Sequence, residues 1–373
     1  MNAMRRRLVW PIALLTCGAL LLQGCGATAK TQKAGRRHSV RAAASFREAL
    51  PALDAVQFLT PKLGFIAGNG IVLETRDGGN SWTRIYQGQK TISAIDFTAA
   101  DAGLALEEDG QVLAWDGRRW QAVFGGLGPA AAVHLAQGGA TTILTAAGDL
   151  YGAPGPAGPY SKESLSDVTA VSFAGAQTGW AVTGGPSAFA VWVTRDGGQT
   201  WSRSLSTALS QRQGWTAALA ASGSAAWLLL TSNQGQMEHQ PYVVYANQGY
   251  GQSWQEPLAA PLFAVQGMYP SAQQSLFGLQ AGPFAAQRAA AVFVSWQPGP
   301  PSDLLALTTT QDGGQSWRQL PIRTVPAADI PAFFSPMAIS MSGTSIWLVG
   351  SRAGSGRVLE SIDGGVSWSV PAF

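Results

Sequence analysis

The chain has 373 residues, of which 46% are hydrophobic and 12% charged, and its formal net charge is +3. This composition excludes an intrinsically disordered chain, and the length is sufficient to bury a large core. The two cysteines, Cys17 and Cys25, are too few for a disulfide framework.

The first 24 residues have the pattern of a bacterial export signal. Arg5–Arg7 precede an apolar stretch, Leu8–Leu22, which is short for a membrane span. The segment Leu22–Cys25 resembles the lipobox of bacterial lipoproteins. The resemblance implies that residues 1–24 are removed and that Cys25 carries a lipid, which places the protein on the extracytoplasmic side of the cell membrane. An ordinary secretory signal with an incidental cysteine is the alternative.

A basic segment follows, and we interpret residues 25–49 as the lipidated cysteine and a flexible tether. Its basic side chains are Lys30, Lys33, Arg36, Arg37, Arg41 and Arg47. Each gains about 1 kcal/mol beside an anionic membrane, although the tether is equally well read as a solvated linker. The remaining chain holds more acidic than basic side chains, so we expect no binding to nucleic acid.

An eight-residue repeat, called the box below, occurs four times in residues 50–373. Each copy joins a hydroxyl residue, an Asp-Gly-Gly turn and a Trp, at 75–82, 194–201, 310–317 and 361–368. A degenerate copy at 247–254 has Gly249 in place of the Asp. Asp-Gly-Gly is typical of a tight turn, and the Trp has the area to anchor the next strand in a core. We therefore interpret the repeated residues as structural, namely Asp77, Trp82, Asp196, Trp201, Asp312, Trp317, Asp363 and Trp368.

The box resembles the Asp-box, or bacterial neuraminidase repeat, of β-propellers. Aromatic residues that open the last strand of a unit recur at intervals of 38 to 63 residues, at Trp82, Trp120, Tyr160, Trp201, Trp254, Trp317 and Trp368. These intervals are close to the about 40–50 residues of a propeller blade, and each unit offers four strand-like segments. The sequence thus predicts an all-β fold, a seven-bladed propeller of four-stranded antiparallel blades over residues 50–373. A pair of β-sandwiches does not explain the spacing. The first and last units both look complete, so ring closure requires no strand exchange, and an addition of Ser45–Leu53 to the last blade stays open.

Two segments exceed the repeat and are candidates for partner binding. Gln280–Asp303 contains Phe293 and Trp296, and Arg323–Pro336 contains Phe333 and Phe334. Their alternative role is to cover a blade edge or the channel mouth. Arg118 and Arg119, in the turn of the second unit, are further candidates, with solvated turn residues as the competing interpretation.

No catalytic, cofactor or metal site is predicted. A sialidase-like enzyme needs an arginine cluster, a Tyr–Glu pair and an acid/base carboxylate, and no such set is evident. A carboxylate that recurs in several blades is better explained by structure than by catalysis. The histidines, His38, His134 and His239, lack the spacing of metal ligands.

The unit that combines residues 178–182, Thr-Gly-Trp-Ala-Val, with the box at 194–201 resembles the photosystem II stability/assembly factor-like family. The resemblance covers about residues 54–373, with shortened, absent or degenerate boxes in units two, three and five. It implies a membrane-anchored, non-enzymatic scaffold for a protein partner, such as a membrane protein or complex, without the photosynthetic role. We expect a monomer. A sialidase-like glycoside hydrolase and a passive cell-surface structural lipoprotein are the alternatives.

Overall fold

The computed structural model describes residues 50–185, 188–208, 215–222, 225–232, 242–247, 254–260, 292–297, 304–309, 318–322, 335–352 and 355–371. The chain divides into two compact units, Met1–Ala42 and Ala43–Phe373, and every described residue belongs to the second. The predicted export signal, the lipidation site Cys25 and most of the tether therefore lie outside the described residues. The same holds for Asp312, Trp317, Phe333 and Phe334. Within the described ranges, no helix has both the length and the apolar character needed to cross a membrane.

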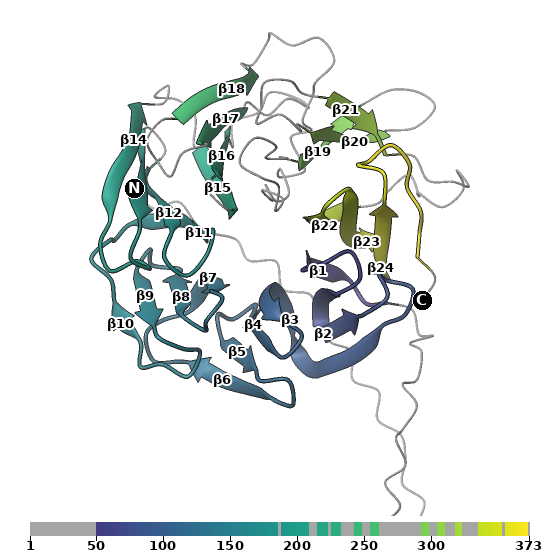
Figure 1. Ribbon diagram of the computed structural model, residues 1–373, viewed down its shortest axis with the longest axis horizontal. Coiled ribbons are helices and arrows are strands. Elements are labelled where there is room, and N and C mark those ends of the chain that lie inside the picture. Colours follow the sequence, from purple (N-terminus) through teal and green to yellow (C-terminus); the bar gives the residue numbers. More distant parts are fainter. Residues whose placement is uncertain are drawn as a thin grey trace, which may run out of the picture. The chain divides into compact units, whose positions relative to one another are not determined.

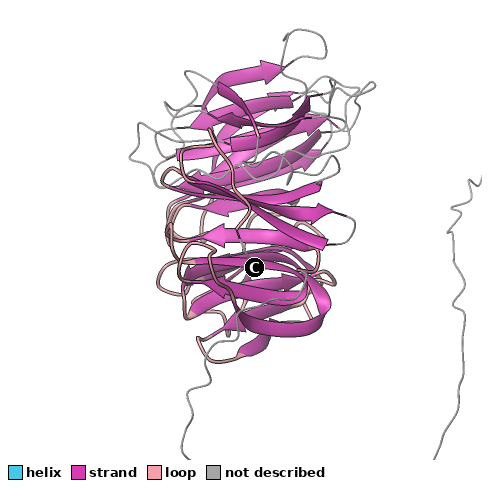
Figure 2. Ribbon diagram, turned by 90° about the vertical axis from the view of Figure 1, so that its right-hand side faces the viewer, coloured by secondary structure: helices cyan, strands magenta, loops and turns pink. Residues whose placement is uncertain are grey.

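The described elements are β-strands, as the short runs of β-branched and aromatic residues between Gly-rich turns predict (Figure 2). The first six are β1 (Leu53–Phe58), β2 (Gly64–Thr75), β3 (Thr83–Ala99), β4 (Ala102–Glu107), β5 (Val112–Trp115) and β6 (Trp120–Phe124). The next eight are β7 (Ala130–Leu135), β8 (Thr141–Thr145), β9 (Leu150–Ala153), β10 (Ser161–Lys162), β11 (Val168–Phe173), β12 (Gly179–Gly185), β13 (Ala188–Thr194) and β14 (Ser202–Ala208). Then come β15 (Trp215–Ser222), β16 (Ala225–Ser232), β17 (Tyr242–Asn247), β18 (Trp254–Ala260), β19 (Val292–Gln297), β20 (Leu304–Thr309), β21 (Arg318–Pro321), β22 (Ser335–Ser342), β23 (Ser345–Arg352) and β24 (Ser355–Ser361).

These strands form antiparallel sheets arranged around a common centre, which is the β-propeller fold (Figure 1). Three sheets have four strands each, β7–β10, β11–β14 and β15–β18, and are called blades three, four and five below. A six-stranded sheet, β1–β6, contains blades one and two, because the long strand β3 pairs with β2 through its first part and with β4 through its second. The described strands β19–β21 and β22–β24 form two further sheets. The predicted all-β propeller with antiparallel four-stranded blades is confirmed, and the count of seven blades stays a prediction.

One packing rule recurs inside the blades. The innermost strand carries a Phe at or near its end, and the partner of this Phe on the next strand is Gly, as in the pairs Phe58–Gly64, Phe97–Gly103 and Phe173–Gly179. A Cβ at each of these glycines would overlap the Phe ring. Glycine is therefore required by the close approach of the ring, and this explains why Gly stands at or next to the start of the apolar strand in these units.

Adjacent blades are joined by a second recurring contact, called the latch below. A side chain near the end of one innermost strand accepts a hydrogen bond from a backbone N–H of the next blade. In the described latches, the donors and acceptors are Phe58 N and Ser340 Oγ (2.8 Å), Phe97 N and Gln57 Oε1 (2.6 Å), Leu135 N and Asp96 Oδ2 (2.9 Å), and Ala221 N and Ser172 Oγ (3.0 Å). Between blades three and four, His134 instead stacks on Phe173, with ring centroids 5.0 Å apart.

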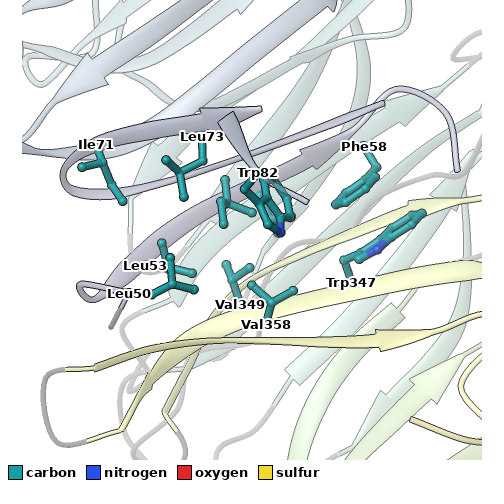
Figure 3. Packing of buried hydrophobic residues seen from close by; sticks show 11 residues of the cluster. Leu50, Leu53, Phe58, Ile71, Leu73, Trp82, Trp347, Val349 and Val358 are labelled. Carbon is teal, nitrogen blue, oxygen red and sulfur yellow. The ribbon is translucent and has the colours of Figure 1, made fainter. Parts of the chain in front are cut away.

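The first and last described sheets meet and close the propeller at this point. Gly356 N, in β24, donates to the carbonyl of Leu50 at 2.8 Å, and Pro51 forms a bridge with Ser355. Trp82, Trp347 and neighbouring aliphatic side chains fill the space between these sheets (Figure 3). Residues 50–51 thus pair through their backbone with the last sheet. They belong to Ser45–Leu53, the segment that the sequence left open as an addition to the last blade. Residues 45–49 lie outside the described residues.

Candidate functional site

The described boxes are self-contained turns. In the first box, Asp77 Oδ1 accepts from Ser81 N at 2.9 Å, and Asp77 Oδ2 accepts from Ser81 Oγ at 2.5 Å. Thr75 Oγ1 donates to Asp77 Oδ1 at 2.9 Å and accepts from Gly79 N at 2.8 Å. The same bonds recur in the boxes at 194–201 and 361–368, and the two glycines of each described box have φ between 75° and 100°.

These bonds determine the electrostatics of the box carboxylates. Hydrogen bonds from the side chain and backbone of Thr200 lower the pKa of Asp196 to about 2, and those from Ser367 lower the pKa of Asp363 to about 2. At Asp77, desolvation opposes the shift, but the bonds from Ser81 and Thr75 lower the pKa. Both oxygens of each carboxylate hold their own turn in place, which gives the described box aspartates a structural role and leaves them poorly suited to proton transfer.

The aromatic residues that close the boxes differ in burial. Trp82 and Trp368 are 3% and 2% exposed, whereas Trp201 is only half-buried. Trp201 packs against the small cluster between blades three and four and directs its indole N–H at a carboxylate, as described below. The box tryptophan is therefore a core anchor at the first and last described boxes and partly a polar contact in blade four.

The structure does not bring the predicted partner-binding residues together in one described site. Arg118 and Arg119 lie on the exposed β5–β6 turn, where their backbone N–H groups donate to Asp116 Oδ1, both at 2.9 Å. This geometry supports the turn interpretation for their backbone and leaves the Arg118 side chain in solvent. The backbone of Phe293 and Trp296 is part of strand β19, and Phe333 and Phe334 lie outside the described residues.

A hollow of about 710 Å³ lies between blades three and four, and the sequence did not reveal it. Blade three has a Pro/Gly loop, residues 154–159, in place of a box. The first residue of this loop, Pro154, lines the hollow together with residues 196–199 of the blade-four box. The wall of the hollow includes Lys162, Glu163, Gln177, Asp196 and Gln199. We refer to it below as the inter-blade hollow.

Glu163 is the unusual residue of the inter-blade hollow. Its Oε2 accepts from Trp201 Nε1 at 3.1 Å, while its Oε1 is buried and receives no hydrogen bond from any described residue. The carboxylate lies over Gly198, the second glycine of the box, where a Cβ would overlap it. In the first box the corresponding glycine, Gly79, faces the ring of Pro371. Blade three therefore places a carboxyl where the last sheet places an apolar ring.

Burial raises the pKa of Glu163 to about 7; the hydrogen bond from Trp201 opposes this shift, and the negative charge of Asp196 adds to it. The neighbouring residue Lys162 pairs with another carboxylate, since its Nζ lies 2.8 Å from Asp149 Oδ1. A carboxyl with a raised pKa in the wall of an open hollow, with one buried oxygen that no described residue bonds, is a typical functional-site signature. The available sequence signal was an acidic residue beside the one turn that lacks a box.

The raised pKa of Glu163 makes the fold less stable as pH increases. Between pH 4.5 and about 7 the unfolded chain releases the proton that the folded chain retains, so the free energy of unfolding falls across this interval. Because the carboxyl is partly solvated, we expect a loss of about 2 kcal/mol. Glu163→Gln should remove this loss, which urea denaturation at pH 4 and pH 8 measures. Gln177→Ala, in the same wall, should keep the wild-type dependence of the free energy of unfolding on pH. If Glu163→Gln also kept that dependence, Glu163 would not be the group responsible for it.

The described residues contain no group of three or more His, Cys, Asp or Glu side chains placed to hold a metal ion.

No protein-family model matches the sequence, and no curated protein matches it. Several solved structures do. YCF48 bound to D1 peptide is 17% identical with a TM-score of 0.52, and the match covers 84% of this chain and 94% of that one. YCF48 from Cyanidioschyzon merolae is 15% identical with a TM-score of 0.53, over 84% and 95% of the two chains.

A GH74 xyloglucanase from Xanthomonas campestris is 14% identical with a TM-score of 0.57, over 88% of this chain and 55% of that one. The solved neighbours thus include both a peptide-bound propeller and a glycoside hydrolase. At these identities the likeness shows the β-propeller fold alone.

Proposed function

We propose that this chain is a lipid-anchored, extracytoplasmic propeller that binds a protein partner and catalyses no reaction. The inter-blade hollow is the observation that carries this proposal, because its wall holds a carboxyl with one oxygen to which no described residue donates a hydrogen bond. The box carboxylates are committed to their own turns, which argues against a catalytic use. A propeller solved with a bound peptide, YCF48 with D1 peptide, supports this use of the fold.

The finer features of the proposal rest on the sequence. The spacing of the aromatic residues supports seven blades over residues 50–373, with the long segments around Phe293, Trp296, Phe333 and Phe334 as additional binding loops. The lipobox-like segment that ends at Cys25 supports a membrane anchor and an extracytoplasmic location, with residues 25–49 as the tether. A monomeric scaffold that acts on a membrane protein or complex fits these features together.

Site-specific photocrosslinking in membranes tests the proposed partner. A photoreactive amino acid at Gln199, in the wall of the inter-blade hollow, should give one dominant protein adduct that mass spectrometry identifies. The same amino acid at Asp109, on the exposed turn between β4 and β5, is the matched control and should not give that adduct. No adduct from Gln199 would favour a passive structural lipoprotein. Turnover of a fluorogenic glycoside panel that Glu163→Gln abolishes would favour a hydrolase.

Lipid anchoring makes a separate prediction. Cys25→Ser should move most of the protein from the membrane fraction to the soluble fraction, because the lipid would have no acceptor. Cys17→Ser removes the other cysteine of the chain and should leave the protein in the membrane fraction. Fractionation followed by immunoblotting measures both. Retention of Cys25→Ser in membranes would refute the anchor without affecting the proposed partner.

A further inference from the structure

The inter-blade hollow has the chemistry of a cation site. Among its described lining residues, the ionisable groups other than Glu163 are already paired. Asp196 accepts from Thr194 and Thr200, and Lys162 Nζ lies 2.8 Å from Asp149 Oδ1. Glu163 Oε1 is the buried carboxyl oxygen in this wall that no described residue satisfies. An occupant of the hollow that carries an N–H donor would remove this unfavourable state.

The sign of the occupant's charge follows from the neighbours of Glu163. Asp196 lies close enough to destabilise the ionised form of Glu163 through its own negative charge. An anionic ligand would add a third negative charge, whereas a cation would be attracted by both carboxylates. The indole of Trp201 already occupies one lone pair of Oε2, so Oε1 is the oxygen left for a ligand. Because Oε1 is buried, a ligand reaches it only when the Glu163 side chain or the groups around it shift.

We infer that the inter-blade hollow binds a basic side chain, arginine or lysine, of the protein partner, with Glu163 as its counter-ion and Trp201 as the group that positions Glu163. This inference rests on the proposed function for the source of the side chain, since a protein partner supplies it. The side chain enters between the Pro/Gly loop of blade three and the box of blade four, past Gln177 and Gln199. An ammonium or guanidinium group then donates to Glu163 Oε1 in a charge-assisted hydrogen bond.

The contact predicts a pH dependence of binding. The groups that face Glu163 include the Trp201 indole, the Asp196 carboxylate and the backbones of Gly152 and Gly198. The ammonium of the adjacent Lys162 is paired with Asp149. A bound cation favours the ionised form of Glu163, so binding releases a proton from the fraction of molecules that is protonated. Affinity for a cation should therefore rise as pH increases from about 5.5 to about 8.

Fluorine NMR of the full chain in non-ionic detergent micelles tests the inference. The chain carries 5-fluorotryptophan, the Trp201 signal is assigned by its loss in Trp201→Phe, and the probe is the blocked tripeptide acetyl-Gly-Arg-Gly-amide. A saturable shift of the Trp201 signal is expected at pH 8, with affinity about tenfold or more lower for the citrulline tripeptide, an uncharged near-isostere. Lysine in place of arginine should retain binding.

Glu163→Gln is the matched variant, because it preserves shape and removes the charge. It should keep the dispersion of the other tryptophan signals and bind the arginine tripeptide about tenfold or more weakly at pH 8, with no pH dependence. Equal affinity for arginine and citrulline, unchanged binding by Glu163→Gln, or no shift of the Trp201 signal would each overturn the inference. A crosslinked partner without tripeptide binding would refute the inference alone, whereas tripeptide binding without a crosslinked partner would refute the proposed function.

Discussion

Replacing Trp82 with alanine is expected to lower the free energy of unfolding by about 3–5 kcal/mol. Trp82 is 3% exposed and packs in the cluster that joins the first and last described sheets (Figure 3). Its ring meets Phe58 edge-on at 6.2 Å, and Phe58 in turn stacks on Trp347 at 3.5 Å. The substitution therefore removes a large apolar surface where the two ends of the propeller meet, and it leaves a cavity that the stacked rings cannot fill without rearranging.

Trp201→Ala is the matched comparison, since Trp201 occupies the same box position but is half-buried. We expect it to cost about 2 kcal/mol, because less apolar area is lost. Urea denaturation followed by circular dichroism measures both variants at one pH. An equal loss of free energy of unfolding for the two variants would contradict the role assigned to Trp82. The cluster between the first and last described sheets would then contribute no more than the junction between blades three and four.

The box and its spacing were predictable from the sequence because their causes are local. Asp77, Thr75 and Ser81 bond to one another within seven residues, and positive φ at Gly78 and Gly79 is a property of the turn itself. The apolar strand that begins at Gly179 is likewise recognisable from its own residues. A ring of repeated sheets follows once such units recur at blade-sized intervals.

The latches were not predictable, because their acceptors share a place in the fold rather than a residue type. Gln57, Asp96, Ser172 and Ser340 differ in length and charge, yet each accepts a backbone N–H of the next blade. A repeat search that compares residue types therefore overlooks them.

Glu163 was missed for a related reason. Its carboxyl lies over Gly152 of its own blade and over Gly198 in the box of the following blade, which lies more than thirty residues away. The predicted partner-binding residues Arg118 and Arg119 are basic residues in the turn of one unit, whereas the hollow is formed by two blades together. Sites between repeats need the packing of both repeats, which only the fold supplies.

Asp96→Ala is expected to lower the free energy of unfolding by about 3 kcal/mol, because one carboxylate connects three blades. Asp96 Oδ1 accepts from Gln57 Nε2 of blade one at 3.0 Å. Asp96 Oδ2 accepts from Leu135 N of blade three at 2.9 Å and lies 2.8 Å from His134 Nδ1. Alanine would leave Leu135 N and His134 Nδ1 without this acceptor, whereas Gln57 Nε2 would keep its second acceptor, the carbonyl of Phe97 at 3.2 Å. Contacts at two successive junctions would therefore be lost.

Two variants separate the contributions. Asp96→Asn keeps one acceptor oxygen for Leu135 and should cost about 1–2 kcal/mol, and Ser172→Ala removes a latch that rests on one bond and should cost about 1 kcal/mol. Hydrogen exchange of the Leu135 and Ala221 amides identifies the junction that opens in each variant. If Asp96→Ala cost no more than Ser172→Ala, the three-blade connection would carry no extra stability and each junction would act alone. The expected order, with alanine at 96 the most damaging, follows because the ring is held by contacts between neighbours and Asp96 serves two junctions simultaneously.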